Sequence, residues 1–271
     1  MKTFNQKVRN IIQQRNSLLC VGLDTRADLI PASLRSAKNP VAEFNRMIIQ
    51  ATSDATAAYK PNLAFYEALG PICYETLQQT LDCIPQDILT IGDAKRGDIG
   101  TTAEKYAQAL YDLGFDSVTI NPYMGFDAVK PFIEDPEKGV FILCLTSNPS
   151  SRDLQYLDVG GRPLYEYVAE KIASWNSNDN VGLVVGATHP EELERIRSIV
   201  GDLPILIPGI GAQGGDLQSA IQYGTDSHGE MALINSSRGI LYASKGDDFA
   251  EAAASEAFKL RDQMNTIRHS K

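Results

Sequence analysis

The chain has 271 residues, of which 43% are hydrophobic and 22% are charged. This composition excludes intrinsic disorder, because so many apolar residues can bury a sizeable core. The formal net charge of −9 argues against non-specific binding to nucleic acid or to an anionic membrane, so an anionic substrate would need a locally positive pocket. Apolar runs such as residues 18–23 and 140–145 are far shorter than the roughly 20 residues that cross a bilayer.

The first residues and the cysteines both favour a soluble cytoplasmic protein. Phe4, Val8, Ile11 and Ile12 recur at helical spacing among polar residues, which predicts an amphipathic helix rather than a secretory signal. The chain has 4 cysteines and no C-x-x-C motif, a pattern typical of ordinary thiols in a reducing compartment.

From residue 18 onward, short apolar runs alternate with helical stretches. The runs are nearly continuously apolar, as expected for strands of a parallel sheet that is covered on both faces. The predicted strands are residues 18–24, 55–60, 88–95, 116–122, 140–146, 181–188, 204–210 and 231–237. The predicted helices between and after them are residues 38–54, 66–80, 101–113, 125–133, 163–177, 189–200, 214–223 and 247–267.

This alternation predicts an α/β fold, a (β/α)8 TIM barrel, with the extra N-terminal helix closing its bottom. We expect one domain over residues 1–271, because no linker, low-complexity tract or charge block divides the chain. An open, doubly wound sheet is the structural alternative. Residues 147–162 form a polar stretch too long for an ordinary strand-to-helix connection, and we expect them to act as a lid.

Active sites of such barrels lie at the carboxyl ends of the strands. Polar and charged side chains follow the predicted strands there. They are Asp24, Lys60, Asp93, Lys95, Asn121, Ser147 and Arg238. The pattern therefore predicts one reactive cluster at the mouth of the barrel.

The densest group is the segment 93–102, DAKRGDIGTT. Residues two apart on a strand face the same way, so Asp93 and Lys95 should project together, with Asp98 in the following loop. Carboxylates beside Lys95 favour its ammonium form, and Lys60 on the adjacent strand would extend the alternating charges. A charged lysine suits proton donation or carbanion stabilisation better than Schiff-base formation. The alternative is a salt-bridge network that only closes the barrel rim.

The second group is the segment 208–216, PGIGAQGGD, which follows the seventh strand. Its glycines fit G-x-G-x-x-G, but the position argues against dinucleotide binding, which uses the first strand of a Rossmann unit. The loops after strands 7 and 8 are the usual phosphate site of a barrel. Pro208 opens this segment, Gln213 lies within reach of a phosphate there, and Arg238 would supply a charged fork. A plain glycine-rich turn beside a surface arginine is the alternative.

Other chemistries find little support in the sequence. Ser147 has no histidine at a neighbouring strand end, so we expect it to form hydrogen bonds rather than act as a nucleophile. No His/Cys cluster has zinc spacing, and lysines near Asp24 would compete with a cation. We therefore expect no metal and no cofactor.

These motifs together resemble the orotidine 5'-phosphate decarboxylase family, in its longer, bacterial-type branch. The resemblance is carried by VGLD (21–24), YKPN (59–62), DAKRGDIGTT (93–102), PGIGAQGGD (208–216) and NSSRGI (235–240). It covers about residues 18–245. One departure is that Ser237 precedes Arg238 where many relatives have glycine, which leaves open which backbone amide contacts phosphate.

The resemblance implies conversion of orotidine 5'-phosphate to UMP and CO2 in pyrimidine biosynthesis, without cofactor or metal. Lys95 would protonate C6, and Asp93 would lie against the departing carboxylate. Lys60 and Asp24 would hold the ribose. The remaining implied contacts are Ser147 to the pyrimidine, Pro208, Gln213 and Arg238 at the phosphate, and Asp98 and Thr102 contributed across the interface of a homodimer.

The residues leave three other functions open. A related phosphosugar decarboxylase, acting on 3-keto-gulonate 6-phosphate, shares the D-x-K-x-x-D pattern but uses a metal-stabilised enediolate. A barrel that binds a nucleotide phosphate without turnover would not need apposed carboxylates. A nicotinamide-dependent oxidoreductase is the third alternative.

Overall fold

The computed structural model describes residues 2–188, 190–210 and 216–270. Its eight strands are parallel, and each pairs with the next along the chain. The strands are β1 Leu19–Gly22, β2 Ala58–Lys60, β3 Leu89–Arg96, β4 Ser117–Ile120, β5 Gly139–Leu145, β6 Val181–Val185, β7 Ile205–Ile207 and β8 Ala232–Ser236. All eight predicted strands are present, within a few residues of their predicted bounds.

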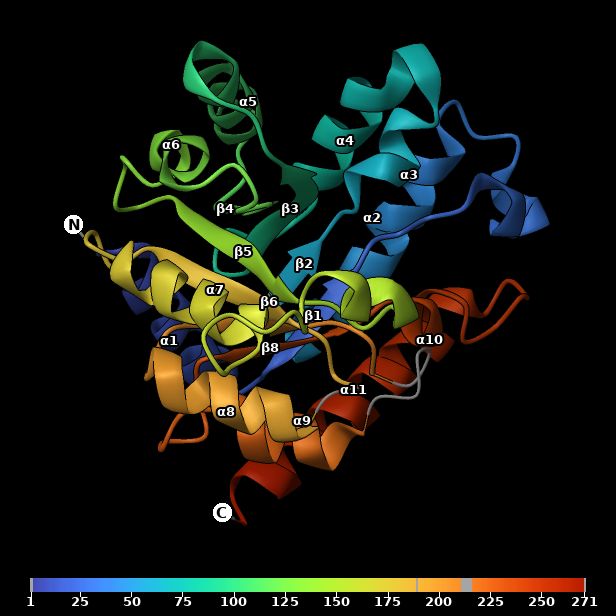
Figure 1. Ribbon diagram of the computed structural model, residues 1–271. Helices are drawn as coiled ribbons and strands as arrows, with labels where there is room; N and C mark the ends of the chain where they lie inside the picture. Colours follow the sequence, from blue (N-terminus) through green and yellow to red (C-terminus); the bar gives the residue numbers. More distant parts are fainter. Residues whose placement is uncertain (1, 189, 211–215, 271) are drawn as a thin grey trace.

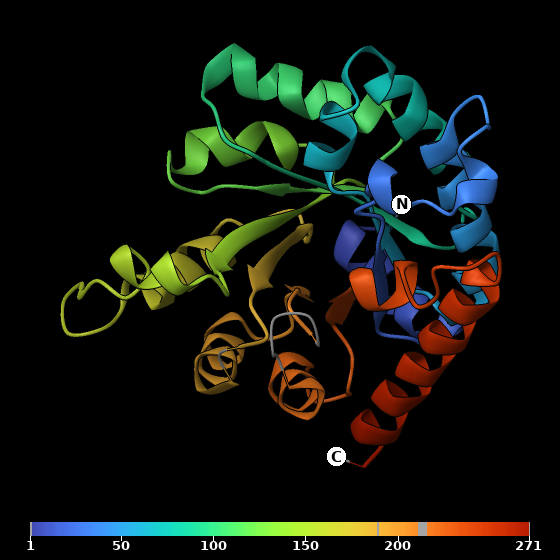
Figure 2. The same ribbon diagram turned by 90° about the vertical axis from the view of Figure 1, so that its right-hand side faces the viewer.

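The helices surround the strands, as Figures 1 and 2 show. They are α1 Phe4–Arg15, α2 Pro40–Thr52, α3 Leu63–Glu67, α4 Cys73–Leu81, α5 Gly100–Asp112, α6 Phe126–Val129, α7 Leu164–Ser174, α8 Pro190–Val200, α9 Leu217–Gly224, α10 Arg238–Leu241 and α11 Phe249–Arg268. The long helix α11, red in Figure 2, packs against α2, α9 and α10. In the described part of the chain, no helix has both the length and the apolar character needed to cross a membrane.

The sheet closes on itself, because β1 pairs with β8 as well as with β2. Leu19 lies opposite Ile234 and Val21 lies opposite Ser236 across this last seam. Strand residues that face into the barrel and those that face the helices are both buried. This explains why the strands appear in the sequence as continuous apolar runs. The predicted TIM barrel is confirmed, and the open, doubly wound alternative is excluded.

Two predicted helices are shorter or broken in the structure. The helix predicted over residues 66–80 is divided into α3 and α4 by a 3-10 turn, Gly70–Ile72, where Gly70 has φ +68° and Pro71 lacks the amide of a continuous helix. The helix predicted over residues 125–133 ends at Val129, and a 3-10 turn containing Pro131 follows. In both places, proline chemistry outweighs the helical spacing of the apolar residues.

Helix α1 lies across the amino ends of the strands, as predicted. The backbone amides of Phe4 and Asn5 donate to the carbonyls of Pro136 and Asp179, which precede β5 and β6. The Phe4 ring packs edge-on against Phe141 at a centroid distance of 5.8 Å. The bottom of the barrel is therefore closed by apolar packing, and the opposite end remains for chemistry.

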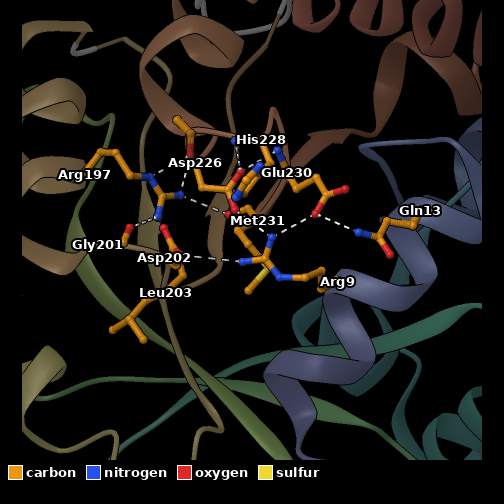
Figure 3. Close-up of polar contacts among 11 residues, drawn as sticks. Arg9, Gln13, Arg197, Gly201, Asp202, Leu203, Asp226, His228, Glu230 and Met231 are labelled. Carbon is orange, nitrogen blue, oxygen red and sulfur yellow. Dashed lines mark hydrogen bonds and ion pairs between the residues drawn. The ribbon is translucent and has the colours of Figure 1, made fainter.

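Charged groups at the bottom form a structural network (Figure 3). Arg9 on α1 bonds Asp226 at 2.9 Å and Glu230 at 2.8 Å, and so ties the helix to the loop before β8. Arg197 on α8 donates to the carbonyls of Gly201, Leu203, Gly224 and Met231. Burial lowers the pKa of Arg197 to about 10. These arginines join helices to strand starts and are far from the mouth of the barrel.

Candidate active site

A cavity of about 890 Å³ opens at the carboxyl ends of the strands. It is lined by seven of the residues singled out in the sequence, Asp24, Lys60, Asp93, Lys95, Ser147, Pro208 and Arg238. Six of the seven side chains predicted to cluster at the mouth of the barrel therefore line one cavity, whereas Asn121 does not line it. Asp98 and Thr102 do not line this cavity, and Gln213 lies outside the described residues.

The centre of the cluster is the Asp93 carboxylate, which lies between two lysines. Lys60 Nζ is 2.8 Å from Asp93 Oδ2, and Lys95 Nζ is 2.5 Å from Asp93 Oδ1. Both lysines reach the same acid, Lys60 from the end of the neighbouring strand β2 and Lys95 from two residues further along β3. The expectation that Asp93 and Lys95 project together is confirmed.

The two cations hold Asp93 in its charged form. Burial alone would raise the pKa of this carboxyl, but the charges of Lys60 and Lys95 outweigh burial and hold the pKa well below its usual range. For Lys60, burial would lower the pKa, and the carboxylates of Asp93 and Asp24 raise it above its ordinary value instead. Asp93 and Lys60 are therefore both charged at neutral pH.

Asp24, two residues after the end of β1, extends the array. Its Oδ1 lies 3.9 Å from Lys60 Nζ, which is an ion pair but too long for a hydrogen bond. Among the described residues, this buried oxygen has no hydrogen-bond partner. On β1, burial raises the pKa of the Cys20 thiol to about 12, so this thiol stays neutral. Asp24 thus presents an unused acceptor to the cavity.

Lys95 sits on an irregular part of β3. Its φ of +48° lies in the left-handed region, which side chains other than glycine rarely adopt. The register between β3 and β4 shifts between Gly92 and Arg96, so this segment bulges from the ladder. The side chain of Lys95 remains 48% exposed and faces the cavity.

Arg238 lies across the cavity, at the start of α10. Ser237 precedes it, and the side chain of Ser237 occupies the space above Gly22, where an added Cβ would lie 1.9 Å from Ser237 Oγ. Gly22 therefore leaves room for the side chain of Ser237. Pro208 and Gly209 line the same end of the cavity.

Several residues at the site were not singled out from the sequence. Asn62 lines the cavity and caps α3 by accepting from the Ala64 amide, and Asn235 lines it from β8. Thr119 on β4 bonds both Asp93 and Lys95. Asn62 belongs to the YKPN motif, which was a usable signal, whereas a threonine in an apolar strand gives none.

The polar stretch 147–162 contributes only its first residues to the cavity wall. Ser147 and Asn148 line the cavity, while Gln155 bonds Thr146 and the hydroxyl of Tyr156 donates to Glu192 at 2.8 Å. Leu154 and Leu157 are more than half exposed. The role of this stretch as a lid stays a prediction. In the described part of the chain, no group of three His, Cys, Asp or Glu side chains is placed to hold a metal ion.

The closed barrel carries a cavity with polar and charged side chains at the carboxyl ends of its strands. This is the place where TIM-barrel enzymes have their active sites. Residues 17–254 match the model of the Orotidine 5'-phosphate decarboxylase / HUMPS family. The chain belongs to this family.

Its relatives bear the same description. The chain is 51% identical over 270 residues to the orotidine 5'-phosphate decarboxylase of Dehalococcoides mccartyi strain BAV1, covering 98% of each chain. It is 47% identical to that of Azoarcus sp., covering 98% of this chain and 99% of the relative. The solved OMP decarboxylase of Leishmania donovani is 42% identical, with a TM-score of 0.85 over 96% of this chain and 98% of that one. The Leishmania donovani UMP synthase structure matches all of this chain with a TM-score of 0.90 and 41% identity, but the chain spans only 57% of its length.

The free energy of unfolding of the protein should depend on pH through Asp93. Since its folded pKa is depressed, Asp93 stabilises the fold above the unfolded pKa of about 3.9, and this contribution is lost as pH falls below that value. Asp93→Asn should therefore lower the free energy of unfolding at pH 7 by roughly 3 kcal/mol. In urea titrations, the difference in the free energy of unfolding between Asp93→Asn and the wild type should become smaller as the pH falls from 5 to 3.

Glu43→Gln on α2 is the matched control, because Glu43 also pairs with a cation but on the surface. It should change stability by less than about 1 kcal/mol at any pH. An Asp93→Asn penalty that stays constant down to pH 3 would contradict the assignment of a charged, lysine-paired carboxylate.

Proposed function

We propose that this chain decarboxylates orotidine 5'-phosphate to UMP and CO2 in pyrimidine biosynthesis, without cofactor or metal. The observation that carries the proposal is the Lys60–Asp93–Lys95 array in a cavity that Arg238 also lines. Relatives at about half identity are named for this reaction. We place the activity in the cytoplasm, in keeping with the free thiols of all four cysteines.

Lys95 is the proton donor in this proposal. The bond between C6 and the carboxylate breaks, CO2 leaves, and the electron pair stays on C6 in an sp² orbital without delocalisation. A fixed ammonium stabilises that charge and then transfers a proton to C6. Asp93 lies against the substrate carboxylate, and their repulsion is relieved as CO2 departs.

The remaining charges hold the nucleoside. Oδ1 of Asp24 has no hydrogen-bond partner among the described residues and is an acceptor suited to a ribose hydroxyl, and Lys60 beside it is a donor. Ser147, at the end of β5, reads the edge of the pyrimidine in this arrangement. A ribose hydroxyl of the substrate would thus give the buried Oδ1 of Asp24 the hydrogen bond that it lacks.

Arg238 binds the phosphate, together with Pro208 and its following loop and with Gln213. Arginine is suited to this contact because its planar fork pairs with two phosphate oxygens. Binding energy from a group far from C6 can be used to orient the reacting end and to exclude water.

We also propose a homodimer in which Asp98 and Thr102 complete the partner's site. Neither residue lines its own cavity, although Asp98 lies in the loop after β3 and Thr102 in the first turn of α5. The loops after β3 and β4 carry large exposed apolar side chains, with Ile99 58% and Tyr123 85% exposed. Apolar groups gathered on neighbouring loops favour a contact with a second copy of the chain.

Two substitutions separate chemistry from binding. Lys95→Ala should lower kcat by at least about 10⁴-fold and leave UMP affinity nearly unchanged, because it removes the proton donor and the fixed cation. Arg238→Ala should weaken UMP binding by about 10- to 100-fold, because it removes a charged hydrogen bond to phosphate. The loss of orotidine 5'-phosphate absorbance gives kcat, and calorimetry gives the affinity.

Lys171→Ala and Arg46→Ala are the controls, since both cations lie on outer helices. They should behave as the wild type, and the wild type should keep full activity in EDTA. An unchanged rate in Lys95→Ala would remove the proposed mechanism. No turnover of orotidine 5'-phosphate by the wild type would remove the proposed function.

The shared site can be tested by mixing inactive chains. Lys95→Ala and Asp98→Ala should each be strongly impaired alone. In equal mixtures that exchange subunits, half the dimers are mixed and each mixed dimer has one intact site, so about a quarter of wild-type activity should return. A mixture no more active than the two variants measured separately would show that Asp98 does not serve a neighbouring chain.

A further inference from the structure

The hydroxyl of Thr119 links the two residues at the centre of the site. Thr119 lies on β4 and is 1% exposed. Its Oγ1 accepts from the backbone amide of Lys95 at 2.9 Å and donates to Asp93 Oδ1 at 2.9 Å. A threonine hydroxyl has one proton, so the bond from the Lys95 amide commits that proton to Asp93.

The bulge in β3 explains why this side chain is needed. Gly92 pairs with Val118 and Arg96 pairs with Ile120, so three residues of β3 lie opposite Thr119 alone. The Lys95 amide bonds the Thr119 side chain where a regular ladder would supply a backbone carbonyl. The hydroxyl therefore supports the backbone of Lys95 at the position where φ is +48°.

The same hydroxyl also fixes the acid. Asp93 receives Lys60 on Oδ2 and both Lys95 and Thr119 on Oδ1. Without Thr119, the carboxylate loses its neutral donor, and Lys95 loses the contact that holds its backbone in the bulge. Both ends of the Asp93–Lys95 ion pair thus depend on a single oxygen atom.

We propose that Thr119 is a positioning residue for decarboxylation, holding Lys95 and Asp93 in the arrangement that presents the ammonium group to C6. The inference rests on the proposed function and adds to it a residue that lies behind the ion pair, away from the cavity lining. Its predicted effect is on kcat, because Thr119 does not touch the groups proposed to bind ribose or phosphate.

Thr119→Val keeps the shape of the side chain and removes the hydroxyl. We expect kcat to fall by about 10- to 100-fold, since a displacement of about 1 Å at a reacting group costs that much. KM and UMP affinity should stay within about threefold of the wild type. Thr119→Ser, which restores the hydroxyl, should recover most of the lost kcat. If the valine variant does not fold, Thr119→Cys is measured in its place, because a thiol is a much weaker hydrogen-bond group of similar size.

Thr80→Val is the matched control. Thr80 is also fully buried, accepts from Asn45 at 3.0 Å and donates to the Thr76 carbonyl, but it lies on α4 outside the barrel. It should lower the melting temperature without changing kcat. The proposal is overturned if Thr119→Val (or Thr119→Cys) keeps the wild-type kcat or raises KM instead of lowering kcat. It is also overturned if Thr119→Ser does not recover the lost kcat, or if Thr80→Val loses as much kcat as Thr119→Val. An inactive wild type would instead refute the proposed function.

Discussion

The buried Asp93 carboxylate and its two lysines are the interaction on which the rest of the site depends. Lys60 is only 5% exposed and Asp93 only 10%, so neither charge is stable there without the other. Their mutual attraction fixes both charges before any substrate arrives. A site with fixed charges needs little reorganisation during the reaction, which is the condition for strong electrostatic stabilisation.

The closed barrel brings these groups together from distant parts of the sequence. Asp24 follows β1, Lys60 is the last residue of β2 and Asp93 lies on β3. Arg238 follows β8, which joins β1 at the seam. An overall charge of −9 would repel a phosphate, yet the cavity places Lys60, Lys95 and Arg238 on its walls. By contrast, the arginines at the bottom are used for structure, with Arg9 paired to acids and Arg197 bonded to carbonyls.

The sequence predicted the fold and most of the site because both follow simple periodicities. Continuous apolar runs mark buried parallel strands, so Asp93 and Lys95 could be placed together at the mouth of the barrel without coordinates. The bulge from which Lys95 reaches Asp93 was not predicted. The break between α3 and α4 was missed because the apolar spacing continues across Gly70 and Pro71. Thr119 could not be found, because its role arises from a register shift between two strands, which no local pattern reveals. The roles proposed for Asp98 and Thr102 need a second chain and rest on family resemblance.

The most direct test of the account is a crystal structure of the protein with UMP bound. We expect Lys95 Nζ to lie about 3 Å from C6 of the pyrimidine while still contacting Asp93, with Arg238 on the phosphate. A nucleotide bound with C6 remote from Lys95, or a Lys95 side chain turned out of the cavity, would contradict it.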